Sequence, residues 1–247
     1  MQKQKTNIII LQHIKVEDPG YIKDLMISDG ITLTTIELDE GEKIPKDLSK
    51  FDGMLCMGGP MDTWMEQKYP WLIDEKKRIK DFVVDLKKPF LGFCLGCQLL
   101  GEVVGGKVIK SKSAEIGMLD VDFSDYKQKD IIFSSFPEKI KALQWHSYEV
   151  INLEHNKDIT LLASSPKTKY QIFKYKYHAY GIQFHIEIKN TTVGDWGCVP
   201  EYKNALENEL GKGALEKFDQ DAKANMKMMN NFSTILYSQF KEKILKV

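Results

Sequence analysis

The chain has 247 residues, of which 43% are hydrophobic, and it carries 35 basic and 35 acidic side chains. A chain of this length can bury a substantial core. A net charge of zero argues against nucleic acid and anionic membranes as partners, because both usually select a basic excess. The polar start and the short apolar run over residues 8–11 argue against a signal peptide or a membrane span. Four cysteines do not suggest a disulfide framework, so we expect a reducing, cytoplasmic setting.

The first half of the chain alternates between apolar runs and amphipathic segments, which is typical of parallel strands joined by helices. Strands are predicted at residues 8–11, 31–38, 51–57 and 89–93, and helices at residues 21–28, 70–86 and 95–104. Proline and glycine mark the junctions, as at Pro19-Gly20 and Gly105-Gly106. This order predicts repeated βαβ units.

Beyond residue 106 the pattern changes to short strands separated by polar turns, which predicts an antiparallel extension beside the parallel core. These strands are expected at residues 107–109, 115–123, 140–144, 160–163, 170–175 and 180–187, with residues 145–150 at a strand end. From residue 191 onwards the pattern is helical. We therefore predict an α/β fold with a flavodoxin-like open, mostly parallel sheet and flanking helices. Residues 1–247 would form a single domain, with residues 191–247 as a helical C-terminal extension packed on it.

The most informative stretch is the junction at residues 89–101, with the sequence PFLGFCLGCQLLG. Cys94 lies between a short apolar strand and a helix, and only small residues such as Gly92 and Gly96 allow the backbone to bend so sharply. A thiol at the first turn of a helix lies near unpaired N–H groups, which favour the reactive thiolate. Cys94 is therefore a candidate nucleophile, and Cys97 is expected to be a buried structural residue. Their C-x-x-C spacing leaves a redox pair as an alternative.

Two further stretches contain candidate site residues. The loop Gly58-Gly59-Pro60 follows a buried strand, so its N–H groups can approach a ligand without a Cβ in the way. An ordinary strand-ending turn is the alternative. His185 and Glu187 end an apolar strand, whose two-residue period places both on one side. Glu187 can then bond one imidazole nitrogen and leave the other facing the site, although a histidine at a strand end can also be purely structural.

In this order, the Gly-Gly loop, the G-x-C-x-G-x-Q turn and the Q-F-H-x-E strand closely resemble the motifs of the class I glutamine amidotransferase family, over residues 8–187. Stand-alone members similar to the glutaminase part of GMP synthase are nearest in pattern. The resemblance implies a triad of Cys94, His185 and Glu187. The thiolate would attack the carboxamide of glutamine, ammonia would leave, and water would hydrolyse the γ-glutamyl thioester. His185 can accept the thiol proton and return it to ammonia, while Glu187 fixes the imidazole tautomer.

The same resemblance assigns the remaining site residues. The oxyanion donors would be the backbone N–H groups of Gly59 and Leu95. Substrate contacts would come from Gly58, Gln98, Ser147 and Tyr148. The implied chemistry uses neither a cofactor nor a metal. The expected partners are a small-molecule substrate and, where the ammonia is delivered onwards, a synthase subunit.

Three residues depart from the family pattern. Ile186 stands where proline is usual, which should change backbone stiffness but leaves the triad intact. Cys97 replaces the commoner histidine or methionine, which we interpret as a packing variation. Tyr148 stands where the subgroup usually has an aspartate that can pair with a substrate ammonium. We therefore hypothesise that the preferred substrate is a γ-glutamyl amide or peptide other than glutamine.

Several functional hypotheses stay open at this point. The predicted sheet ends near residue 187, and we expect the residues after it to be too few for a synthase domain. Either a separate partner subunit would accept the ammonia, or the protein would be a simple hydrolase. The alternatives are a metalloenzyme that uses His146, His185 and Glu187, a non-catalytic regulatory module on the same fold, and a DJ-1-like or PfpI-like thiol enzyme. The leading hypothesis predicts that Cys94 and His185 meet at the carboxyl ends of the parallel strands.

Overall fold

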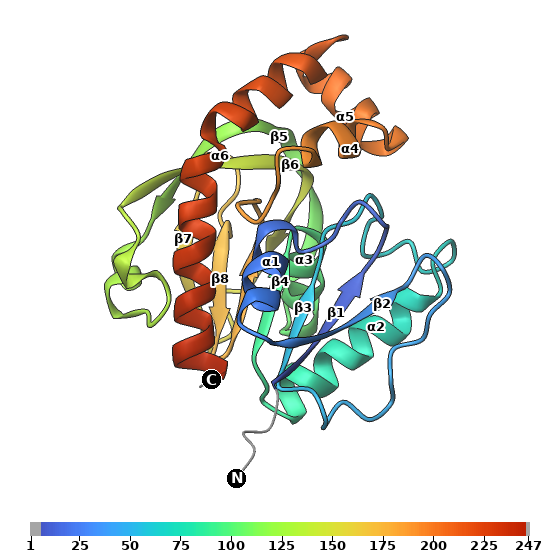
Figure 1. The fold of residues 1–247 in the computed structure, drawn as a ribbon, viewed down its shortest axis with the longest axis vertical. Coiled ribbons are helices and arrows are strands. Elements are labelled where there is room, and N and C mark those ends of the chain that lie inside the picture. The colour runs from blue at the N-terminus through green and yellow to red at the C-terminus, as the bar shows by residue number, and fades with distance from the viewer. Residues whose placement is uncertain (1–5, 246–247) are drawn as a thin grey trace.

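The computed structural model describes residues 6–245, so the polar start at residues 1–5 lies outside the described residues. Within that range, one sheet of nine strands runs through the molecule (Figure 1). Its parallel part has the order β2 (Thr32–Glu37), β1 (Asn7–Gln12), β3 (Gly53–Cys56), β4 (Phe90–Phe93) and β9 (Ala179–Ile182). The sheet continues through the antiparallel strands β8 (Ile172–Tyr175), β7 (Ile159–Ser164), β5 (Lys107–Phe123) and β6 (Lys139–Ile151). The predicted fold class is confirmed.

Helices cover both faces of the parallel strands. Helices α1 (Gly20–Ser28) and α6 (Ala214–Gln239) contribute to one core, and α2 (Trp71–Lys80) and α3 (Leu95–Val103) to the other. The side chains of β1 alternate between them, since Ile8 and Ile10 join the first core and Ile9 and Leu11 join the second. A strand buried on both faces requires the continuous apolar run that the sequence shows. Short helical turns occupy Asp81–Asp85, Asp125–Lys129, Phe133–Ser135 and Phe240–Leu245.

The predicted strands between residues 107 and 150 are wrong in their lengths. Residues 107–123 form one strand, β5, which pairs with β6 along most of its length, and residues 145–150 lie inside β6. The register of this pair shifts between Lys110 and Glu115. Such an irregularity interrupts the alternation of apolar and polar residues, which is why one long strand has the sequence pattern of two short ones.

The strand predicted at residues 180–187 ends at Ile182, and the chain beyond it leaves the parallel sheet. His185 instead forms an isolated antiparallel bridge with Leu143 of β6, with N–H···O distances of 2.9 and 3.2 Å. The Tyr21 N–H of α1 donates to the Glu187 carbonyl at 2.5 Å, and the Ser233 hydroxyl of α6 donates to the Ile186 carbonyl at 2.6 Å. Contacts with β6, α1 and α6 therefore hold this segment in place of a strand ladder.

The C-terminal helices extend from one end of the sheet along its side (Figure 1). Helices α4 (Thr192–Gly197) and α5 (Pro200–Leu210) lie next to each other, and α6 contacts both of them as well as α1 and the β5–β6 hairpin. The apolar side of α6 includes Met226, Met229 and Leu236, which are buried as predicted, whereas Ile235 is partly buried. Across residues 6–245, no helix is both long enough and apolar enough to span a membrane.

Candidate active site

Cys94 lies at the turn between β4 and α3, where its backbone adopts a φ of 48° and a ψ of −103°. A positive φ is strained for a residue with a side chain. Two hydrogen bonds hold the turn: the Cys94 N–H donates to the Ile182 carbonyl at 2.9 Å, and the Gly96 N–H donates to the Met57 carbonyl at 3.0 Å. A Cβ on Gly96 would lie 2.1 Å from the Cys56 carbonyl oxygen. Close packing of the turn against the end of β3 therefore requires glycine at this position.

His185 is buried between two partners. Its Nδ1 donates to Glu187 Oε1 at 2.7 Å, and Cys94 lies close enough to the imidazole to affect its pKa. Burial lowers the pKa of His185, but the charge of Glu187, the nearby Cys94 and the hydrogen bond to Glu187 outweigh it and raise the pKa well above its ordinary value. The Trp196 indole packs edge-on against the imidazole, with ring centroids 4.6 Å apart. The structure thus brings Cys94, His185 and Glu187 together.

Isoleucine at position 186 has a structural consequence. The Ile186 N–H donates to Glu187 Oε2 at 2.9 Å, a bond that proline could not make because it has no N–H. Each carboxylate oxygen of Glu187 is therefore bonded, one to His185 and the other to the backbone. The departure from the family pattern adds a bond that orients the carboxylate toward the imidazole.

Cys94 borders a cavity of about 360 Å³ that lies where β3 and β4 end. The predicted site residues on its wall are Gly59, Cys94, Leu95, Gln98, Ser147 and Tyr148. His185 and Glu187 are buried beside it, and Gly58 packs so closely on the Glu17 carboxylate that an added Cβ would lie 2.5 Å from Oε2. Leu95 is the first residue of α3, so its N–H has no acceptor within the helix. One cavity therefore collects the candidate nucleophile, the candidate oxyanion donors and the predicted substrate contacts other than Gly58.

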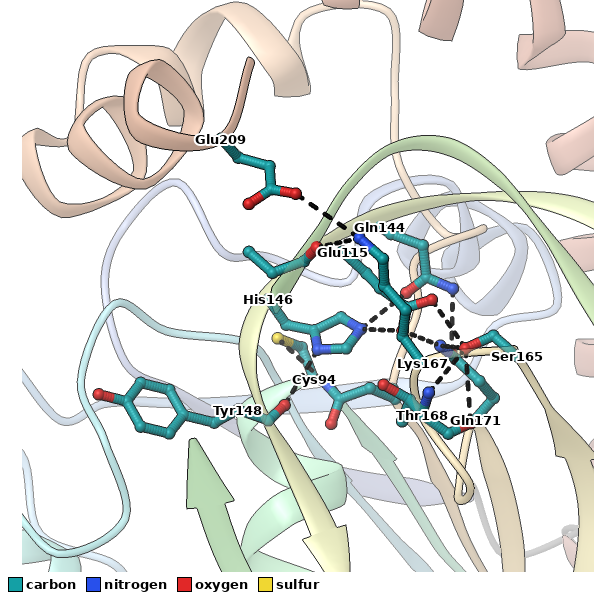
Figure 2. Close-up of polar contacts among 12 residues, drawn as sticks. Cys94, Glu115, Gln144, His146, Tyr148, Ser165, Lys167, Thr168, Gln171 and Glu209 are labelled. Carbon is teal, nitrogen blue, oxygen red and sulfur yellow. Dashed lines mark hydrogen bonds and ion pairs between the residues drawn. The ribbon is translucent and has the colours of Figure 1, made fainter. Parts of the chain in front are cut away.

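A polar network holds the backbone carbonyl of Tyr148, and its bond from His146 is drawn in Figure 2. Gln98 Nε2 lies 3.2 Å from both the Tyr148 carbonyl and Gln183 Oε1, and donates to each. Gln183 Nε2 in turn donates to Cys94 Sγ at 3.6 Å. His146 Nδ1 donates to the same Tyr148 carbonyl at 3.0 Å. Gln98 therefore joins the nucleophile's surroundings to the strand that forms the opposite wall of the cavity.

His146 lies on the same strand and is bonded within the network (Figure 2). Its Nε2 lies 3.0 Å from Gln144 Oε1 and 3.4 Å from Glu115 Oε2. Burial raises the pKa of Glu115, but its contacts with His146 and Ser165 outweigh it and lower the pKa to about 2. Glu115 therefore remains a carboxylate at neutral pH and anchors the network.

The three residues of the metalloenzyme alternative do not converge, because His146 is bonded to Gln144 and Tyr148 while His185 is bonded to Glu187. Within residues 6–245, the group that could offer three metal ligands at close range is instead His13, Cys56 and Glu75, whose ligand atoms lie within 4.8 Å of one another. Cys97 is packed in the core on α3. Burial and the neighbouring charge of Cys94 raise its pKa well above the ordinary value, which disfavours a second thiolate.

Helix α5 forms one wall of the cavity, which the sequence pattern did not predict. Its lining residues are Glu201, Tyr202, Asn204, Ala205 and Asn208. Asp62 and Lys110 bring further charges to the wall, and burial together with the nearby Asp62 raises the pKa of the Tyr148 hydroxyl. The Tyr202 hydroxyl donates to the buried carboxylate of Glu17. The sequence could have indicated Glu17, because polar residues that follow a buried parallel strand lie at the ligand-binding edge of the sheet. No sequence pattern indicated the α5 residues.

Glu17 is a buried acid close to the candidate triad. Burial is the largest effect on it and raises its pKa to about 7, against the opposing effects of the His185 charge and the Tyr202 hydrogen bond. The folded-state pKa thus lies above the ordinary value of 4.5. Protonated Glu17 therefore stabilises the fold, and this stabilisation is complete below pH 4.5 and is lost as the pH rises through about 7.

Glu17→Gln should therefore gain stability relative to the unmodified protein as the pH rises from 5 to 8. The pKa difference corresponds to at most about 3 kcal/mol, because each pKa unit is worth about 1.4 kcal/mol. The free energy of unfolding is measured by urea denaturation of both proteins at each pH. Glu40→Gln, at an exposed position, is the control and should show a constant difference. A pH-independent difference for Glu17→Gln would contradict the raised pKa.

The comparisons with known proteins point to one family. The profile of the class I glutamine amidotransferases matches residues 21–196. A subunit of the glutamine-hydrolysing GMP synthase of Sulfolobus acidocaldarius is 32% identical over 183 residues, which are 74% of this chain and 86% of the relative. The crystal structure of a glutamine amidotransferase from Thermotoga maritima has a TM-score of 0.84 at 26% identity, and the alignment covers 99% of this chain and 100% of that one.

A structure from Thermoplasma acidophilum assigned to a GMP synthase subunit has a TM-score of 0.59 at 22% identity over 100% of both chains, which shows a shared fold. The family match spans more than half of this chain and includes the Gly-Gly loop and the turn at Cys94. The chain belongs to the class I glutamine amidotransferase family.

Proposed function

We propose that this protein hydrolyses the γ-carboxamide of glutamine, or of a related γ-glutamyl amide, through a γ-glutamyl thioester on Cys94. The observation that carries the proposal is that Cys94 borders a cavity of about 360 Å³ and lies near His185, whose Nδ1 donates to Glu187 at 2.7 Å. Membership of the class I glutamine amidotransferase family supports the same chemistry.

In this mechanism, the His185 imidazole takes the thiol proton and the Cys94 thiolate attacks the carboxamide carbon. The imidazolium returns the proton to the departing ammonia, and water activated by His185 then hydrolyses the thioester to release glutamate. Glu187 holds the His185 Nδ1 proton at 2.7 Å and stabilises the imidazolium. The N–H groups of Gly59 and Leu95 would bind the oxyanion, each worth about 3 kcal/mol in comparable sites.

The charges on the cavity wall suit the zwitterionic end of an amino acid. Asp62 and Glu201 supply carboxylates that could bind an α-ammonium, and Lys110 supplies an ammonium that could bind an α-carboxylate. Asp62 lies close enough to the Tyr148 hydroxyl for each to affect the other's pKa, so a carboxylate lies near the position where the subgroup usually has an aspartate. This arrangement supports substrates with a free α-amino-acid end, which glutamine and simple γ-glutamyl amides share.

Transfer of the ammonia to a separate synthase protein is the second candidate function. It is favoured by the 32% identity with the GMP synthase subunit of S. acidocaldarius. That match covers 74% of this chain, whereas the T. maritima glutamine amidotransferase structure matches 99% of it. A synthase partner would be recognised as a protein that raises the rate of glutamine hydrolysis and consumes the ammonia.

The test measures glutamate from both substrates, together with ammonia released from glutamine and methylamine released from γ-glutamylmethylamide, with Cys94→Ser as the inactive reference. Hydroxylamine is added in a parallel assay to trap the thioester as γ-glutamyl hydroxamate. We expect equal amounts of ammonia and glutamate from glutamine, and hydroxamate only when Cys94 is present. Faster turnover of the methylamide would identify the other γ-glutamyl amides as substrates. The proposal fails if neither compound yields glutamate or hydroxamate while Cys94 is still readily alkylated.

A further inference from the structure

The peptide unit between Gly58 and Gly59 carries both a bonded carbonyl and a candidate oxyanion donor. The Gly58 carbonyl accepts a hydrogen bond from His13 Nδ1 at 2.8 Å, and the N–H on the other side of the same peptide plane is that of Gly59, on the cavity wall. In a trans peptide the C=O and N–H point in opposite directions. A group that holds the carbonyl therefore also sets the direction of the N–H.

Two consecutive glycines cannot hold this orientation by themselves. Without Cβ atoms, the backbone on both sides of the peptide has access to conformations that other residues avoid, so a flip of the peptide plane meets little local steric resistance. A flip would turn the Gly59 N–H away from the cavity and present a carbonyl oxygen to the developing negative charge. The bond from His13 opposes that flip.

His13 is itself fixed on its other side. Its Nε2 lies 2.9 Å from Glu75 Oε1, and both side chains are fully buried. The Cys56 thiol donates to the same oxygen at 3.4 Å, and the Trp71 indole stacks on the imidazole with ring centroids 5.6 Å apart. The β1–α1 loop, β3 and α2 thus converge behind the Gly58–Gly59 peptide.

Both ring nitrogens of His13 face acceptors, the Gly58 carbonyl and the Glu75 carboxylate, so an imidazolium satisfies both bonds. Burial lowers the pKa of His13, but the charge and hydrogen bond of Glu75, the Gly58 carbonyl and the charge of Glu17 outweigh it and raise the pKa. Burial and Glu75 raise the pKa of Cys56 well above its ordinary value, so Cys56 remains a neutral donor.

We propose that His13, held by Glu75, is a positioning residue that fixes the Gly58–Gly59 peptide so that the Gly59 N–H faces the Cys94 cavity. This inference rests on the proposed amide hydrolysis, because the N–H is useful only where an oxyanion forms. The bond acts from outside the cavity, so it lowers the barrier of the chemical step without contacting the substrate.

A matched pair of variants separates the two bonds of His13. In His13→Asn the side-chain amide can occupy the place of Nδ1 and keep the bond to the Gly58 carbonyl. In His13→Gln it can occupy the place of Nε2 and keep the bond to Glu75 instead. We expect His13→Gln to lower kcat by about 10²- to 10³-fold, as for loss of one oxyanion donor, and His13→Asn to lower it by less than about 10-fold. KM should change by less than about 3-fold in both, because the bond acts on the transition state.

The rate of Cys94 alkylation by iodoacetamide is the control, because that displacement at carbon creates no oxyanion. It should be nearly equal in the two variants and the unmodified protein. Equal loss of kcat in both variants, or loss of alkylation in parallel with kcat, would overturn the proposal in favour of a general packing role. A stoichiometric metal ion that is bound by the unmodified protein and lost in both variants would also overturn it, since His13 would then serve as a ligand with Cys56 and Glu75.

A crystal structure of His13→Gln gives a readout that does not depend on turnover. We expect a reoriented or disordered Gly58–Gly59 peptide, whereas the peptide of His13→Asn should keep its orientation. An unchanged peptide in His13→Gln would refute the positioning role even if the protein proved to be a glutaminase. A reoriented peptide in a protein without amidase activity would instead leave the positioning role standing and count against the proposed function.

Discussion

Replacing Cys94 with alanine is expected to lower kcat for glutamine hydrolysis by at least about 10⁴-fold, because the thioester cannot form and triad members act as a unit. The fold should survive. The strained backbone at φ 48° is already adopted by a residue with a Cβ, and loss of one buried sulfur costs about 1 kcal/mol. Glutamate release is measured together with the thermal unfolding midpoint, so that loss of chemistry is distinguished from loss of structure.

Cys198→Ala is the matched control for this prediction, since Cys198 is an exposed free thiol on the C-terminal side of α4. It should keep full activity and still be alkylated at Cys94. If Cys94→Ala retained more than about 1% of the glutaminase rate, a nucleophile other than Cys94 would have to be sought, because triad nucleophile variants keep far less.

Replacing Glu187 with glutamine is expected to lower kcat by about 10³- to 10⁴-fold through the wrong imidazole tautomer. The Ile186 N–H donates to one oxygen of Glu187 at 2.9 Å, so the oxygen of the new amide should stay there. The amide nitrogen would then face His185 Nδ1 as a donor. The Nδ1 atom would have to accept, which leaves the proton on Nε2, where the thiol proton must be received.

The pH dependence gives this second prediction an independent check. The Glu187 carboxylate raises the pKa of His185, so Glu187→Gln should lower that pKa, and the His185 ring should lose its proton at lower pH. NMR titration of the His185 ring reports this directly. Glu40→Gln, at an exposed position, should alter neither kcat nor the titration. An unchanged His185 titration in Glu187→Gln would show that the carboxylate does not act on the imidazole.

Local features of the sequence determined the parallel core and the motifs of the site. An apolar run that is continuous from Ile8 to Leu11 can only be buried on both faces, and helices indeed cover both. Glycine two residues after Cys94 indicates a tight strand-to-helix turn, since a Cβ at Gly96 would collide with the Cys56 backbone. These properties depend on residues within one turn or one strand, so the local sequence is enough to predict them.

The tertiary structure alone decided which distant side chains complete the site. The prediction that Glu187 bonds His185 assumed that both residues lie in one strand. The strand ends at Ile182, and a bridge to Leu143 places His185 instead. The two side chains are nevertheless hydrogen-bonded. Glu17 bonds Tyr202 of α5, and His13 bonds both Gly58 and Glu75. Such contacts depend on how segments far apart in the chain pack against one another, and no periodicity within a segment encodes them. The candidate site residues could therefore be proposed from local motifs, while the walls of the site, its buried charges and the orientation of its loops were decided by long-range packing.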